Sequence, residues 1–386
     1  MSVSNAKKQA VCEKYRTYLE IIYTFGNKVM LMKQLYEYAK LLGLAKSYSF
    51  FYCSIMELVD AEILRKEPFV AYGKTTQLQM LTIRKFGIRF LEGKQDSYSV
   101  ASVRKSHGNE RIMVSIFKNC YILNKVIPRI IKEGKSVTFT EIMDLLNHDY
   151  STILLNKNQG LSFITQIRTD KTLQQFFDTT EVDHDTKRMQ EIKKTVAEGL
   201  RKGSESSEGK GKGKLCAGSR LSLIDLNNEI YAKVGRDYTK DEKINNYTVD
   251  TMLAFNAYIA QIKVVNNKPI IAILIFDIHN KTNIYKIATH IACIYNMFNR
   301  YFKCKFLLRV GVISIDEHAS KNLESQAKGT YIDFMTKERR GIRLLAILNE
   351  WRVDALMQES IKVRFADNNI TNEFMDAIKH ANLVRR

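Results

Sequence analysis

Two clusters of polar residues follow long apolar runs, at places where α/β folds often hold reactive groups. Asp277 and His279 come at the end of one run, and Asp316, Glu317 and His318 follow the next. Carboxylate and imidazole side chains are ligands for divalent metals, so the two clusters together could support metal-dependent phosphodiester chemistry. The alternative, which we favour, is that these polar residues only mark the points where buried strands reach the surface.

The residue sets of several nucleic-acid enzymes are missing from the sequence. A restriction-type nuclease would carry a Glu-x-Lys motif on the strand next to its first acid, and residues 306–315 contain none. A rolling-circle initiator would carry two histidines around one apolar residue, but His290 stands alone. A tyrosine recombinase would place its catalytic residues in a different order from Tyr331, Arg339 and Arg340. The sequence therefore predicts no catalytic residue, metal site or cofactor, and it favours a protein that is not an enzyme.

The distribution of charge points to a polyanionic partner. The chain has 60 Lys and Arg against 41 Asp and Glu, a net charge of +19. Residues 1–135 hold 23 basic and 11 acidic residues, so they carry +12, and the remaining 251 residues carry only +7. Codon usage in an AT-rich genome would explain many lysines, but not an uneven excess over acids. A basic region of this kind attracts nucleic acids and releases their counterions on binding.

Residues 27–92 begin with two expected helices separated by a short break. Asn27 is a possible N-cap for the first helix, and Gly43 ends it. Ser47 can cap the second helix. The apolar residues of this second helix recur at helical spacing and share one face, which predicts that the face is buried. They are Phe51, Ile55, Leu58 and Val59.

A hairpin and a closing helix are expected to follow. Residues 69–72 and 77–83 are predicted strands that flank a tip at residues 73–76, and residues 86–91 are a predicted helix. The order helix, turn, helix and two-stranded hairpin resembles the winged helix-turn-helix DNA-binding proteins. The resemblance covers about a sixth of the chain.

This resemblance implies that the second helix enters the major groove of DNA while the hairpin contacts the backbone or the minor groove. The outward face of the helix carries hydroxyl and aromatic groups but no Arg, Asn or Gln, the side chains best suited to bidentate base contacts. A module used for protein contact is therefore the alternative. The residues expected to bind DNA are Lys46, Ser47, Tyr48, Ser49, Tyr52, Lys74, Thr75 and Thr76.

The whole chain is expected to have a mixed fold in four parts. These are a winged-helix domain at 1–95, a helical region at 109–202, a flexible Gly/Lys/Ser linker at 203–219 and an α+β or α/β domain at 220–386. Outside the DNA-binding segment, helices are expected at 6–23, at 111–133 with a bend at Pro128, at 141–147 with Thr140 as cap, and at 163–177. The last domain is expected to contain strands at 253–265, 270–278 and 306–315 and helices at 283–302, 339–357 and 372–381.

In composition and in its N-terminal segment the chain loosely resembles plasmid replication initiators and copy-control proteins of low-GC Gram-positive bacteria. The resemblance implies a sequence-specific protein that binds double-stranded DNA in replication or copy control of a plasmid or other mobile element. The C-terminal domain would contact a second copy or replication or transcription proteins. Alternatives are a transcription regulator with a ligand- or partner-sensing domain, and a metal-dependent enzyme using Asp277 and Asp316.

Localisation is expected to be cytoplasmic, in a cell of bacterial type. No window of about twenty residues is both apolar and free of charge, so no membrane helix and no membrane partner are expected. The lysines near the N-terminus are not followed by the apolar core of a secretory signal. The six cysteines are scattered, without a Cys-x-x-Cys pair, as in reduced proteins.

Overall fold

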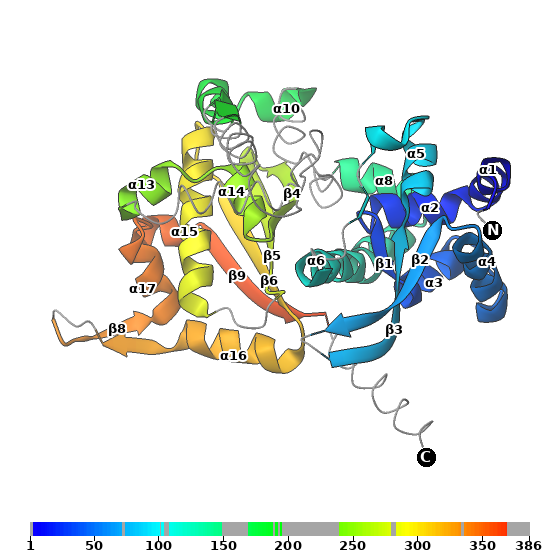
Figure 1. Cartoon of the computed structure of the whole chain (residues 1–386). Coiled ribbons are helices and arrows are strands. Elements are labelled where there is room, and N and C mark those ends of the chain that lie inside the picture. The colour runs from blue at the N-terminus through cyan, green and yellow to red at the C-terminus, as the bar shows by residue number, and fades with distance from the viewer. Residues whose placement is uncertain are drawn as a thin grey trace, which may run out of the picture. The chain divides into compact units, whose positions relative to one another are not determined.

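The computed structural model describes residues 3–71, 74–100, 102–103, 108–148, 169–187, 190–191, 194, 239–278, 283–332 and 336–368. The predicted linker at 203–219 and the predicted helix at 372–381 lie outside these residues. The chain divides into two compact units, one consisting chiefly of the residues up to His148 and the other chiefly of Asp149–Ser314 and His318–Ala366 (Figure 1). The fold is mixed: helices with a small antiparallel sheet come first, and a four-stranded mixed sheet with helices follows.

The N-terminal unit is built around a three-stranded antiparallel sheet of order β1-β3-β2. Two helices precede the first strand, two more lie between the first and second strands, and one follows the third. The elements are α1 (Asn5–Lys14), α2 (Arg16–Thr24), β1 (Val29–Leu31), α3 (Met32–Leu41), α4 (Tyr48–Asp60), β2 (Leu64–Ala71), β3 (Lys74–Ile83) and α5 (Lys85–Glu92), with a 3₁₀ turn at Ser97–Ser99.

Two predictions for the first thirty or so residues are corrected. Asn27 does not cap a helix; it has a φ of +50°, and α3 starts five residues later with Leu31 as its N-cap. The intervening residues form β1, in which Val29 pairs with Thr82 of β3. Apolar residues at this spacing suit a helix start or a strand equally, so pairing with a distant strand decides between them. The predicted single helix at 6–23 is also wrong, because Tyr15 leaves helical geometry and separates α1 from α2.

The break between α3 and α4 follows the prediction closely. Gly43 has a φ of +68°, the left-handed conformation that glycine adopts without steric cost, and it ends α3. The Ser47 side chain accepts a hydrogen bond from the backbone N–H of Phe50 and caps α4. Phe51, Ile55 and Leu58 are fully buried, as their helical spacing predicts, whereas Val59, expected on the same face, is only partly buried.

The hairpin is longer than its sequence pattern indicated. β2 and β3 pair from Leu64↔Ile83 out to Ala71↔Lys74, with an irregularity between Pro68 and Val70. Residues 72 and 73, which include part of the predicted tip, lie outside the described residues. A helix after β3 is confirmed as α5, within a residue of the predicted range at each end.

A further group of helices packs with the N-terminal unit. It comprises α6 (Gly108–Tyr121), a π-helical turn (Ile122–Val126), α7 (Ile127–Lys132) and α8 (Phe139–His148). The predicted long helix is thus present, but it is interrupted by the π-helical turn just before Pro128. Proline has no N–H to donate, which favours an irregular turn at this point. The cap of α8 is Thr138 rather than Thr140, because the Thr138 hydroxyl accepts from the Glu141 N–H at 3.1 Å.

Buried hydrogen bonds join α6 to the preceding helices and strand. Asn119 lies at the centre, where its Oδ1 accepts from the Tyr38 hydroxyl at 2.9 Å and its Nδ2 donates to the Phe25 carbonyl at 3.3 Å. The Ser115 hydroxyl donates to the Val29 carbonyl at 2.6 Å. Segments about 80 residues apart in sequence are therefore linked by polar groups that water does not reach.

The C-terminal unit contains a four-stranded sheet of order β4-β5-β6-β9, with β4 antiparallel to β5 and β5 parallel to β6 (Figure 1). α15 connects the parallel pair, as the predicted strand-helix-strand pattern requires. The elements that the structure describes in the rest of the chain include α10 (Lys171–Gln174), α13 (Lys240–Asn245), α14 (Val249–Ala254), β4 (Ala257–Val265), β5 (Lys268–Phe276), α15 (Ile284–Tyr301), β6 (Leu307–Ser314), α16 (Glu317–Lys328), β7 (Thr330–Ile332), β8 (Arg339–Ile342), α17 (Arg343–Glu350), α18 (Ala355–Gln358) and β9 (Ile361–Asp367).

Two predictions for this unit are corrected. The strand expected at 253–265 begins only at Ala257, because α14 occupies the preceding residues and Asn256 turns the chain with a φ of +56°. The helix expected at 339–357 is wrong as a single element. Its first residues form β8 with β7, and α17 ends before Arg352, whose φ is +63°.

Candidate nucleic-acid interface

The five residues predicted to bind DNA from α4 and its cap share one exposed surface. Lys46, Ser47, Tyr48, Ser49 and Tyr52 are all exposed, and Tyr48 and Tyr52 have 51% and 38% of their surface open to solvent. The helix directs its apolar stripe into the core, so the remaining arc of its surface is left for other contacts. The arrangement expected from helical spacing is therefore present.

Aromatic rings form a continuous cluster along this surface. The ring of Tyr36, from α3, meets Tyr48 edge-on at 5.1 Å between centroids and lies 5.2 Å from the buried ring of Phe51. The Tyr48 ring lies 6.3 Å from that of Tyr52, one helical turn further along α4. We call Tyr36, Tyr48 and Tyr52 the tyrosine cluster. Phe50 is 59% exposed on the opposite edge of the same arc.

Lysines border the tyrosine cluster. The Lys66 ammonium, from β2, donates to the Tyr52 hydroxyl at 3.1 Å and lies 5.0 Å from the centre of its ring. Lys40 lies 5.1 Å from the centre of the Tyr36 ring and also pairs with Glu37. Residues 42–56 include no acidic side chain. This surface thus combines aromatic faces with positive charge.

The nearest acid on α4 itself faces a different element. The Glu57 carboxylate accepts from the Lys14 ammonium at 2.8 Å and from the Tyr15 hydroxyl at 2.6 Å. The hydrogen bond from Lys14 is the largest cause that lowers the pKa of Glu57, and the bond from Tyr15 adds to it. The negative charge of Glu57 is thus balanced by Lys14 of α1, so it does not repel an anion bound at the tyrosine cluster.

Sequence reasoning missed Tyr36 and Lys66. Tyr36 lies next to the core residue Leu35 on α3, and Lys66 lies in a strand 14 residues after Tyr52. The local pattern of apolar residues shows that neither side chain belongs to the buried face of its own element. Only the packing of α3 and β2 against α4 brings the two residues to one surface. The predicted hairpin residues Lys74, Thr75 and Thr76 form the start of β3, and their side chains lie outside the described residues.

The polar clusters at the strand ends of the C-terminal unit do not assemble a metal site in the described residues. Asp277 is only 4% exposed, and its backbone N–H donates to the Ile313 carbonyl at 2.9 Å. Asp316 lies just before α16, and His279 is outside the described residues. Within the described part of the chain, no three His, Cys, Asp or Glu side chains come close enough to hold one ion.

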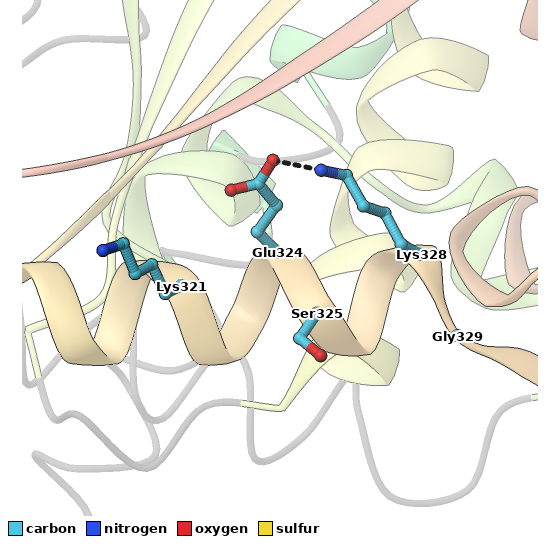
Figure 2. Close-up of a pocket in the computed structure, with 5 residues that line it drawn as sticks. All are labelled: Lys321, Glu324, Ser325, Lys328 and Gly329. Carbon is cyan, nitrogen blue, oxygen red and sulfur yellow. Dashed lines mark hydrogen bonds and ion pairs between the residues drawn. The ribbon is translucent and has the colours of Figure 1, made fainter.

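A shallow depression lies along α16, with a volume of about 490 Å³ (Figure 2). Lys321, Glu324, Ser325, Lys328 and Gly329 line it, all from this helix or the residue after it. The Lys328 ammonium pairs with the Glu324 carboxylate at 2.6 Å, across the top of the helix in Figure 2. An ion pair within one exposed helix is typical of a solvated surface, so the depression gives little sign of a specific ligand.

Comparisons with protein-family models, with curated proteins and with solved structures gave no match to this chain. None of the helices in the described ranges combines the length and the apolar character needed to span a bilayer.

Proposed function

We propose that the N-terminal unit is a winged helix-turn-helix module that binds DNA, with α4 as its recognition helix and the β2–β3 hairpin as its wing. The order α2-β1-α3-α4-β2-β3 and the β1-β3-β2 sheet support this assignment, since a winged helix places a short strand before its helix pair and pairs it with the hairpin. The capped start of α4 directs its first backbone amides at solvent, where they can meet a phosphate.

The observation that carries the proposal is the charge of this exposed face. Lys46 precedes α4, Lys66 borders Tyr52, and no acid occurs between residues 42 and 56; Lys40, beside Tyr36 of α3, pairs with Glu37. The N-terminal end of a helix also carries partial positive charge from its backbone amides. A phosphate backbone is the partner that best complements such a surface.

For the whole chain we propose a sequence-specific DNA-binding protein in replication or copy control of a plasmid or another mobile element, with the C-terminal unit as an assembly or partner domain. A transcription regulator with a sensing C-terminal domain is the second candidate. Footprinting separates the two, because an initiator would protect repeated sites at an origin and a regulator would protect sites at promoters.

Lys46→Ala and Lys66→Ala should each weaken binding of the full chain to every duplex, by roughly threefold to tenfold at moderate salt, because lysines contact phosphates rather than bases. Each change should also lower the slope of log affinity against log salt by about one. Fluorescence anisotropy over a salt series measures both effects. Lys268→Ala, at the exposed first residue of β5, is the matched control and should change neither.

The proposal is contradicted if the full chain gives no mobility shift with any DNA at low salt. Equal losses for Lys268→Ala and Lys66→Ala would also contradict it, since binding would then follow net charge rather than this surface.

A further inference from the structure

The exposed face of α4 is poorly equipped to recognise the edges of paired bases. Arg, Asn and Gln make the strongest bidentate contacts in the major groove, and none occurs between residues 43 and 60. Three of the exposed side chains, Tyr48, Phe50 and Tyr52, are instead large aromatic groups. Within a stacked duplex the faces of the bases are covered by their neighbours, so an aromatic ring finds little to stack upon.

We propose that the tyrosine cluster stacks with unpaired bases, so that this module binds DNA containing a locally opened segment in preference to fully paired duplex. The inference rests on the proposed function, since it names the kind of DNA that the same surface takes. Every base presents a π-face once it is unpaired, and stacking on an aromatic side chain is tolerant of sequence.

The rings are held in place before any ligand arrives. Tyr48 has Tyr36 on one side and lies 6.0 Å from the ring of the buried Phe51, which is itself packed against Tyr36. Lys66 holds the hydroxyl of Tyr52. Side chains that are fixed in this way lose little conformational entropy on binding, which favours a specific stacking role over incidental exposure.

The lysines around the cluster favour a polyanion over a second protein chain as the occupant. Lys66 lies against the Tyr52 ring and Lys46 precedes α4, whereas the charge of Lys40, beside Tyr36, is balanced by Glu37. Two copies of the protein that met through this face would bring these like charges together. A single strand that leaves a duplex offers both of the required features, phosphates for the lysines and base faces for the tyrosines.

The test uses the full chain and three DNA probes of one sequence: a duplex, the same duplex with a central mismatched bubble, and one strand alone. At one salt concentration we expect the bubble and the single strand to bind at least about tenfold more tightly than the duplex. Tyr48→Ala and Tyr52→Ala should each weaken binding to the two unpaired probes by roughly fivefold to a hundredfold, with less than about a twofold effect on the duplex.

The matched controls separate stacking from other roles of these side chains. Tyr48→Phe and Tyr52→Phe keep the rings and should keep the preference, even though the second loses the contact of its hydroxyl with Lys66. Tyr98→Ala removes an exposed tyrosine of the same unit that lies outside the cluster, and it should have no effect. Far-UV circular dichroism of each variant verifies that it is folded.

Several results would overturn the inference and separate it from the proposed function. Equal affinity for paired and unpaired probes would contradict the inference, as would an equal loss of affinity for both kinds of probe in Tyr48→Ala. In either case α4 would bind intact duplex, in agreement with the proposed function. Tighter binding to the RNA version of the strand would assign the surface to another nucleic acid. A change in sedimentation for Tyr48→Ala with no change in DNA affinity would make the face a contact between copies. If no probe bound at all, the proposed function itself would be contradicted.

Discussion

Replacing Asn119 with alanine is expected to destabilise the N-terminal unit by about 3 kcal/mol. The side chain is fully buried on α6, and it bonds the Tyr38 hydroxyl and the backbone carbonyls of Phe25 and Ser115. Burial raises the pKa of Tyr38 well above its ordinary value, so its hydroxyl remains a proton donor. Alanine would leave that donor and the Phe25 carbonyl buried without their partner, and each such group costs about 1–3 kcal/mol.

Urea unfolding followed by circular dichroism measures the loss, and the only tryptophan supplies an internal control. Trp351 lies in the C-terminal unit, so its fluorescence transition should stay at the same urea concentration in the variant. Tyr38→Phe is the matched comparison and should cost about 1 kcal/mol, because it leaves one acceptor unsatisfied and keeps the aromatic volume. A loss below about 1 kcal/mol for Asn119→Ala would mean that this network does not hold α6 in place.

The Asn119 network bears on how the DNA-binding module should be isolated. Buried polar groups of α6 form hydrogen bonds with the preceding helices and strand. Among them, the Ser115 hydroxyl donates to β1, and the Ile116 carbonyl accepts from Gln34 of α3 at 3.0 Å. A fragment that ends near residue 95 would expose the partners of these groups to water. We therefore expect a fragment that keeps the tyrosine cluster in its observed form to include α6, as residues 1–148 do.

Elements specified by local signals could be predicted from the sequence. α4 has an apolar stripe at helical spacing and a serine cap, and both features act within a few residues of one another. The strands β5 and β6 and the helix between them follow from two buried apolar runs separated by an amphipathic segment. Their boundaries agree with the expected ones to within a few residues.

Elements that depend on distant partners could not be predicted from the sequence. β1 exists because Val29–Leu31 pairs with residues about 50 positions later, and no local pattern distinguishes it from the start of a helix. β8 likewise requires β7 as its partner. The sequence from Arg339 onward suits a helix, but its first residues pair with β7 and form a strand instead. The same reasoning applies to the candidate interface. Spacing predicts that Tyr48 and Tyr52 point outward, but the packing of α3 and β2 adds Tyr36 and Lys66.

Acid should destabilise the C-terminal unit through His290, a residue of α15. The centre of its imidazole ring is 3.7 Å from that of Phe255, and its Nδ1 lies 3.2 Å from the Tyr247 hydroxyl. Burial, with a smaller contribution from the nearby Lys286 ammonium, lowers the pKa of His290 from 6.5 to about 3. The folded unit therefore keeps this imidazole neutral, whereas the unfolded chain protonates it below pH 6.5.

The sign of the effect follows from this difference in proton binding. Stability from the neutral imidazole is fully present above pH 6.5 and is lost as the pH falls from 6.5 towards 3, at about 1.4 kcal/mol per pH unit. At pH 5 the loss should be about 2 kcal/mol, and urea unfolding followed by Trp351 fluorescence measures it, because Asn296 of α15 donates to the Trp351 carbonyl.

Two variants separate His290 from the other titrating groups. His290→Asn keeps a polar atom near the position of Nδ1 but cannot take up a proton, so it should lose most of this pH dependence whatever its stability at neutral pH. Tyr247→Phe removes the hydrogen bond and leaves the burial, which is the larger cause of the lowered pKa, so its pH dependence should persist. If His290→Asn and the unaltered chain lose stability in parallel between pH 7 and pH 5, other groups control acid unfolding and the imidazole is accessible to protons in the folded unit.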